Sequence, residues 1–287
     1  MKNDLDFVKV CAFLKITAKD IPPNATSENL DIMIYQKRIS KQLEISKDLL
    51  KLATKVSKLC IGDMSIDCAY LSKVTLLRQL NHYKTVLYLA ENLHSDTNLI
   101  SRSMFEGALY FFYLCHDPKM MREWRLYSCV ETLKLIDKAK SNGENVPQEL
   151  LNAVYIYKDE YEKAFKKPNG EFYLSWKKNI TIKQMAMKTK HFQHLYNEYY
   201  VPLSDYHHWG HASLAYDFQI TDDNQDVNVN TSSASLTMIT KSLDLANSSI
   251  YSLLDASINI FNIGQFVTEL KEIMDDLSKI PFAKKRD

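Results

Sequence analysis

The segment YHHWGH, residues 206–211, holds three histidines within five positions. On a helix spanning residues 203–216, Ser204, His208 and His211 recur at i, i+4 and i+7 and therefore share one face. Because a histidine changes charge near neutral pH, this face can supply a general acid or base. His207 and His211 are four residues apart, the spacing of two metal ligands on a helix. The alternative is a set of hydrogen-bonded core histidines, and the sequence leaves open which of the three is functional.

Two charged residues interrupt an otherwise apolar stretch at residues 97–115. Arg102 and Glu106 are four residues apart, so they lie on one face of a helix. Burial of either charge alone is costly, so each needs a partner. One interpretation is a structural ion pair between the two. The other is a polar pocket in the core of the fold, in which the arginine binds a phosphate or a carboxylate.

A basic run precedes the histidines. Between residues 172 and 197 the chain has five lysines, interleaved aromatic residues and no acidic residue. Such a run can bind the backbone of RNA or DNA, although it is also typical of a solvated helix face. The lysines are Lys177, Lys178, Lys183, Lys188 and Lys190.

Motifs for metals and nucleotide cofactors are missing from the sequence. There is no H-E-x-x-H, no Cys/His set with zinc spacing, no P-loop and no G-x-G-x-x-G. A single Glu-x-x-His match, from Glu91 to His94, falls short of the two that a di-iron bundle needs. We therefore predict no metal site and no cofactor.

The elements that position these residues are predicted to be helices. Glycine (6) and proline (7) are scarce in the 287 residues, and strand-type alternation is rare. The predicted fold is all-α, a helical bundle with the apolar helix at 97–115 in its centre and the helix at 203–216 packed near it. The other predicted helices cover residues 1–20, 28–60, 65–94, 119–141, 147–167, 181–198, 234–259 and 264–279.

We predict three parts of the chain: N-terminal helices at 1–62, a core helical domain carrying the candidate site at 63–220, and a polar loop with C-terminal helices at 221–287. The last part is expected to pack on the same core.

Bulk properties predict a cytoplasmic protein. Lysine and arginine number 36 against 35 aspartates and glutamates, so any nucleic-acid contact must come from a local patch. The five cysteines form no C-x-x-C pair, and the N-terminal residues do not resemble a signal peptide. No uncharged apolar stretch reaches the length of about 18 residues that a membrane span requires. We expect no disulfide and no membrane contact.

Two segments together resemble a bacterial family catalogued as a domain of unknown function. The first is R-x-x-x-E at Arg102–Glu106. The second, about a hundred residues later, is a Tyr-rich segment that runs from Tyr199 into Ser-x-x-x-His at Ser204 and His208. The resemblance covers roughly residues 70–220. It implies an all-helical fold with a shared polar site, and it implies no particular reaction. The family pattern needs one histidine where this chain has three, and His208 fits it best.

The combination of arginine and histidine in a helical bundle is also similar, at the level of fold, to the HEPN ribonucleases of toxins and phage-defence systems. Their Arg-then-His motif on one helix is missing here. A site of this kind would have to combine residues from different helices.

These observations lead to three functional hypotheses. The first is an RNA-targeting effector, a metal-independent endoribonuclease in which His208 or His211 acts as general base or acid, Arg102 stabilises charge on the phosphate, and Glu106 orients them. The second is a non-catalytic regulatory or partner-binding module, whose partner is another protein or a second copy of the chain. The third is a metal-dependent helical enzyme using His207, His211 and a carboxylate.

Overall fold

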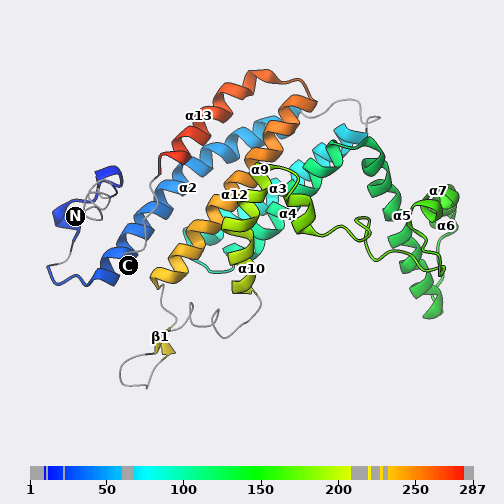
Figure 1. Ribbon diagram of the computed structural model, residues 1–287, viewed down its shortest axis with the longest axis horizontal. Coiled ribbons are helices and arrows are strands. Elements are labelled where there is room, and N and C mark those ends of the chain that lie inside the picture. Colours follow the sequence, from blue (N-terminus) through cyan, green and yellow to red (C-terminus); the bar gives the residue numbers. More distant parts are fainter. Residues whose placement is uncertain are drawn as a thin grey trace.

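The computed structural model describes residues 10, 12–21, 23–59, 67–207, 219–220, 227–228 and 232–280. The fold is an all-α bundle, as predicted (Figure 1). Four long helices form its body: α2 (Ser27–Leu59), α3 (Asp67–Glu91), α4 (Thr97–Cys115) and α12 (Ser233–Ile260). Each of them packs against at least two of the others.

Helix α4 lies at the centre of this bundle. It packs most extensively on α12 and α3, because it is apolar on most of its circumference. Phe111 of α4 and Leu243 of α12 are buried in one core cluster although they are far apart in the sequence. The central position and the bounds predicted for residues 97–115 are both confirmed.

Helices α5 (Pro118–Ser141), α6 (Gln148–Tyr155) and α7 (Lys158–Phe165) project from one end of the bundle (Figure 1). They have a small core of their own, which contains Val130, Val154 and Phe165. The prediction of one helix over 147–167 is wrong, because α6 ends at Tyr155 and a separate helix, α7, begins at Lys158. The run Tyr-Ile-Tyr at 155–157 consists of residues that lose side-chain freedom in a helix, which weakens the helix at this point.

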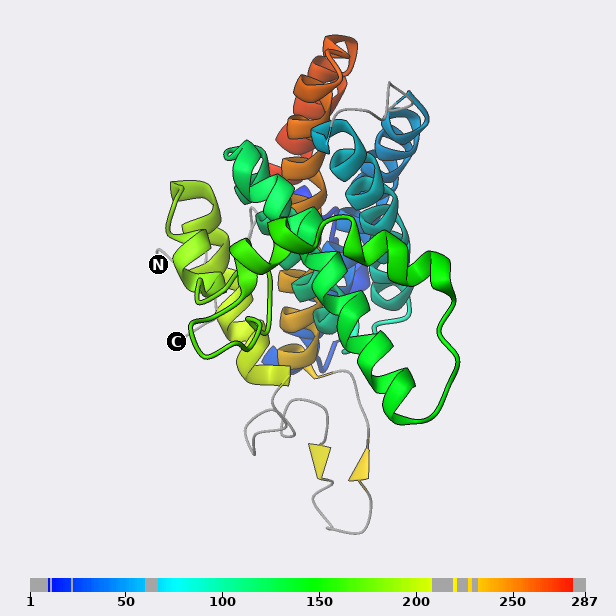
Figure 2. The same cartoon turned by 90° about the vertical axis from the view of Figure 1, so that its right-hand side faces the viewer.

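A series of short helical segments covers one side of α4 and α12 (Figure 2). The segments are α8 (Ile182–Ala186), α9 (Lys190–Leu195), the π-helical turn η2 (Tyr196–Tyr200) and α10 (Val201–His207). The prediction of short helices over residues 181–198 is therefore confirmed. Thr181 caps α8 together with Gln184, and Thr189 caps α9 by accepting from the backbone of Phe192. Each of these caps starts a new helix.

The remaining elements lie at the edges of the bundle. The turn η1 (Ala18–Asp20) precedes α2, while η3 (Gly264–Phe266) leads into α13 (Val267–Ser278), which packs along α2. Strands β1 (Gln219–Ile220) and β2 (Val227–Asn228) pair antiparallel within the predicted polar loop, beyond the end of the bundle where α12 begins (Figure 2). A pair of two-residue strands leaves the fold class unchanged.

Helix α12, which belongs to the predicted C-terminal part, packs directly on α4. The division of the chain at residues 62 and 220 stays a prediction. None of the helices within the described ranges is long and apolar enough to cross a membrane.

Two of the five cysteines have described side chains. Cys115 and Cys129 are half-buried. Cys11 and Cys60 lie outside the described residues, and so does the side chain of Cys68.

Candidate functional site

Tyr200, the last residue of η2, connects the two charged residues of α4. Its hydroxyl donates a hydrogen bond to Glu106 Oε1, with 2.7 Å between the oxygens. The guanidinium carbon of Arg102 lies 5.1 Å from the centre of the Tyr200 ring, in a cation–π arrangement. Among the described contacts there is no ion pair between Arg102 and Glu106, so the direct pair considered from the sequence is not formed. Instead, both side chains contact Tyr200.

The Tyr200 ring is held on several sides. It lies 4.9 Å from the Phe105 ring and stacks on Tyr196 at 5.4 Å, and only 8% of the residue is exposed. Burial raises the pKa of the Tyr200 phenol, the hydrogen bond to Glu106 raises it further, and Arg102 opposes both effects. The phenol therefore keeps its proton at neutral pH and acts as a donor toward the carboxylate.

Arg102 has a donor that no described residue accepts. Its Nε atom is buried and makes no hydrogen bond within the part of the chain that the structure describes. A buried donor without an acceptor costs about 1–3 kcal/mol, so an acceptor supplied by a ligand or by another residue is favoured here. The planar guanidinium group matches two oxygens of a phosphate or a carboxylate.

The second carboxylate oxygen of Glu106 faces Tyr110, one turn further along α4. The Tyr110 hydroxyl lies 3.5 Å from Glu106 Oε2 and accepts a hydrogen bond from Lys177 Nζ at 2.7 Å. Burial and the Glu106 charge both raise the pKa of Tyr110, so its hydroxyl also stays protonated. Lys177, Tyr110, Glu106 and Tyr200 thus form one continuous chain of polar contacts. The four-residue spacing of Glu106 and Tyr110 in the sequence is a signal for this contact.

Ser204 lies on α10, one turn beyond Tyr200. Its hydroxyl donates to the backbone carbonyl of Tyr200 at 2.7 Å, so its proton is used within the helix and only its oxygen lone pairs remain available. Within the described residues α10 runs to His207, whose side chain is not described, and His208 and His211 lie outside the described residues. A shared neighbourhood of Arg102, Glu106 and a histidine therefore stays a prediction.

The described side chains include no group of three or more His, Cys, Asp or Glu residues placed to hold a metal ion. The side chains of His207, His208 and His211 are not among them, so the absence of a metal site stays a prediction.

The predicted basic run divides into two groups. Lys177 contacts Tyr110, and Lys178 forms an ion pair with Glu123 at 2.9 Å. The other three lysines are exposed, and no described acidic residue pairs with them; they are Lys183, Lys188 and Lys190. The unpaired group is the one that can bind a further anion.

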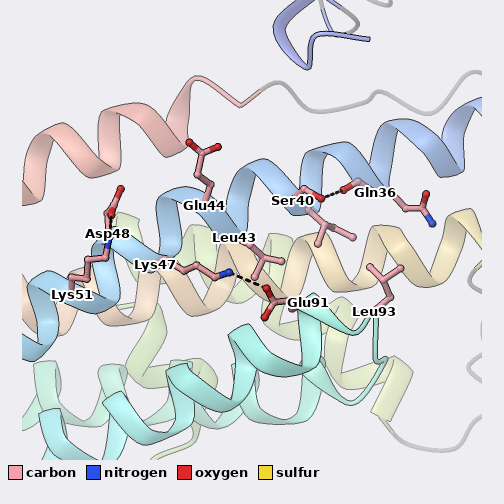
Figure 3. A pocket seen from close by; sticks show the side chains of 10 residues that line it. Gln36, Ser40, Leu43, Glu44, Lys47, Asp48, Lys51, Glu91 and Leu93 are labelled. Carbon is pink, nitrogen blue, oxygen red and sulfur yellow. Dashed lines mark hydrogen bonds and ion pairs between the residues drawn. The ribbon is translucent and has the colours of Figure 1, made fainter. Parts of the chain in front are cut away.

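Two grooves on the surface of the described part of the chain are large enough for a small ligand. A groove of about 720 Å³ lies between the end of α4 and α8, and it is lined by Tyr113, Asn179, Ile180, Lys183, Gln184, Met187 and Lys188. The second groove, of about 540 Å³, lies between α2 and the end of α3 (Figure 3). Its lysines are already paired, Lys47 with Glu91 and Lys51 with Asp48. The first groove is therefore the one that belongs with the predicted site residues.

A polar cluster between α2 and α12 was not predicted. Arg38 Nη2 lies 3.5 Å from Asp244 Oδ2, and Gln42 Nε2 donates to Asp244 Oδ1 at 2.6 Å. Tyr199 lies close enough to interact electrostatically with Asp244 and Arg38. Burial raises the pKa of Tyr199 to about 12, the charge of Asp244 adds to this shift, and the charge of Arg38 opposes it. The adjacent tyrosines of η2, Tyr199 and Tyr200, thus lie next to two different polar clusters.

Comparison with known proteins gives the family and nothing about the reaction. No curated protein and no solved structure matches the chain. Residues 70–226 match the model of a family of unknown function, DUF5677, and the matched stretch contains Arg102, Glu106, Tyr200 and Ser204. The resemblance to an uncharacterised family is thereby confirmed. Because the match includes more than half of the 287 residues, the chain belongs to the DUF5677 family.

Proposed function

We propose that this protein is an RNA-targeting effector of the toxin or phage-defence type, acting in the bacterial cytoplasm as a ribonuclease. The observation that supports this is the state of Arg102. Its guanidinium group lies on the Tyr200 ring, while its buried Nε has no acceptor among the described residues. A fixed guanidinium with an unused donor is suited to a phosphate group.

In the proposed reaction a histidine, His208 or His211, removes the proton from a ribose 2′-hydroxyl. The 2′-oxygen attacks the adjacent phosphorus, and the bond from phosphorus to the 5′-oxygen breaks. An acid returns a proton to the leaving oxygen, so the products are a 2′,3′-cyclic phosphate and a 5′-hydroxyl. Arg102 stabilises the negative charge on the phosphoryl oxygens, and Glu106 positions Arg102 through Tyr200.

The test measures cleavage of a labelled single-stranded RNA by the purified full chain and by the variants Arg102→Lys and His208→Ala. We expect each variant to lose cleavage by roughly 10²–10³-fold, the usual cost of removing one group that stabilises transition-state charge. Arg102→Lys keeps the charge and loses the planar fork. Arg122→Gln is the matched control, since Arg122 is an exposed arginine paired with Glu160 on the projecting helices. Undiminished cleavage in both site variants would refute the proposal.

One observation favours the second candidate, a non-catalytic module. Both carboxylate oxygens of Glu106 face tyrosine hydroxyls, those of Tyr200 and Tyr110, an arrangement that fixes η2 and the basic segment on α4 without any reaction. In that case His208→Ala should lower the free energy of unfolding by about 1–3 kcal/mol, since it would leave buried partners unsatisfied. A catalytic histidine leaves the unfolding curve nearly unchanged. Chemical denaturation of His208→Ala separates the two candidates.

A further inference from the structure

The candidate site extends along one side of α4. Arg102, Glu106, Tyr110 and Tyr113 recur at intervals of three or four residues, so they lie in one stripe on the helix. The stripe is about 16 Å long between its ends, at 1.5 Å per residue. Tyr113, at the end opposite Arg102, lines the groove of about 720 Å³. The groove and the Arg102 cluster therefore lie at the two ends of one helix face.

The groove combines an aromatic ring, apolar walls and free cations. Ile180 and Met187 provide apolar surface beside the half-buried ring of Tyr113. Lys183 and Lys188 line the same groove, and neither has an acidic partner among the described residues. Asn179 adds an amide group that can both donate and accept hydrogen bonds, as the edges of bases do, while Gln184 offers its Nε2 as a donor because its Oε1 already accepts from Thr181.

This combination is typical of sites for single-stranded nucleic acid. An aromatic side chain stacks on the face of an unpaired base, and lysines bind the flanking phosphates. A base inside a duplex does not present its face, since its neighbours cover it. The contacts of Tyr110 with Lys177 and Glu106 lie between the groove and Arg102.

We propose that the groove binds an unpaired nucleobase of an RNA strand, with the phosphates beside it on Lys183 and Lys188 and the backbone continuing along α4 to Arg102. The identification of the strand as RNA rests on the proposed function. The position of the base rests on Tyr113 and the groove alone.

The experiment measures binding without cleavage. The probe is a fluorescein-labelled single-stranded oligouridylate in which fluorine replaces every 2′-hydroxyl, so that the proposed reaction cannot occur. Fluorescence anisotropy gives the dissociation constant over a range of salt concentrations for the full-length wild-type chain, Tyr113→Leu, Tyr113→Phe and the double variant Lys183→Gln/Lys188→Gln. Lys138→Gln/Lys140→Gln is the matched control, because these two lysines are exposed at the end of α5 and have no described acidic partner.

We expect Tyr113→Leu to weaken binding by roughly five- to hundredfold, the range for loss of one stacked base, and Tyr113→Phe to bind like the wild type. The groove double variant should reduce the slope of log K against log salt by about 1.4, or about 0.7 for each lost phosphate contact. The α5 double variant should leave this slope unchanged. The same oligonucleotide annealed to its complement should bind more weakly and should not respond to Tyr113→Leu.

Three results would overturn the inference. The first is that the wild type does not bind the probe, and the second is that all the variants bind it equally. The third is that Lys183→Gln/Lys188→Gln weakens the binding of single strand and duplex equally, while Tyr113→Leu has no effect. The last result would indicate a purely electrostatic surface. If the probe binds in a Tyr113-dependent way while the unmodified RNA is never cut, the groove stands and the ribonuclease proposal fails.

Discussion

Replacement of Gly107 by alanine tests the close approach of α3 and α4 next to Glu106. Gln79 of α3 is only 3% exposed, and its Nε2 donates to the Met104 carbonyl at 3.1 Å. A methyl group on Gly107 would overlap Gln79 Nε2 and would lie 3.2 Å from its Cδ. Gln79 would have to leave its position and break this hydrogen bond.

Two opposing effects set the magnitude. Alanine is about 1 kcal/mol more favourable than glycine inside a helix. Displacement of Gln79 costs about 1 kcal/mol for the lost hydrogen bond and about 1–3 kcal/mol for the buried amide that is left unsatisfied. The cost is larger, so we expect Gly107→Ala to lower the free energy of unfolding by about 1–3 kcal/mol.

A double-mutant cycle with Gln79→Ala isolates this contact. In the Gln79→Ala background the space is open, so Gly107→Ala should stabilise the protein by about 1 kcal/mol through helix propensity alone. Urea unfolding followed by circular dichroism at the helix band gives the four free energies. If Gly107→Ala has the same effect in both backgrounds, the steric reasoning is refuted.

Two further predictions concern the polar clusters. Tyr200→Phe should lower the free energy of unfolding by about 1.5–3 kcal/mol, because it removes a hydrogen bond to the Glu106 carboxylate. The Tyr196 hydroxyl makes no described hydrogen bond, so Tyr196→Phe should change the free energy of unfolding little. If Tyr200→Phe and Tyr196→Phe lower the melting temperature equally, the role assigned to the Tyr200 hydroxyl is wrong. Burial raises the pKa of Asp244 from 3.8 to about 6 against the opposing effects of Arg38 and Gln42, so between these pH values the folded state binds a proton that the unfolded chain has released. The free energy of unfolding should therefore fall as pH rises through this window, by at most about 3 kcal/mol. The fall should be smaller than this limit, because 21% of the Asp244 side chain is exposed to water. If the free energy of unfolding of the wild type follows the same pH profile as that of Asp244→Asn, this prediction is refuted.

The sequence predicted the bundle well where composition alone decides the structure. The stretch 97–115 has only two charges, so its central position and its bounds followed from burial. The bounds of the short helices within 181–198 were harder to place, because Thr181 and Thr189 act as caps only through backbone hydrogen bonds that compete with helix continuation. The pattern T-I-K-Q at 181–184 is a capping-box signal that marks the start of the first of them.

The functional site stays a prediction, and only part of its local arrangement followed from the sequence. Arg102, Glu106 and Ser204 do gather around one residue, but their common partner, Tyr200, is placed by tertiary packing of η2 that no local pattern encodes. The cluster on α2 did have a signal. Arg38, Gln42 and Ser46 recur every four residues, and this polar stripe faces α12 rather than solvent. A polar stripe at helical spacing is normally exposed, so recognising this one as buried required knowledge of the facing helix.

The π-helical turn η2 makes the length of this part of the chain as important as its chemistry. In η2 the Val201 N–H bonds to the carbonyl five residues back, at Tyr196, so the turn accommodates one residue more than an α-helical turn would. Removing one residue between 196 and 200 would restore the ordinary pattern, and because the turn absorbs the extra residue, the residues from Val201 onward would keep nearly the same orientation. Ser204 would therefore stay on its side of α10. The extra residue acts within the turn itself, where it helps the adjacent residues Tyr199 and Tyr200 to lie next to two different polar clusters.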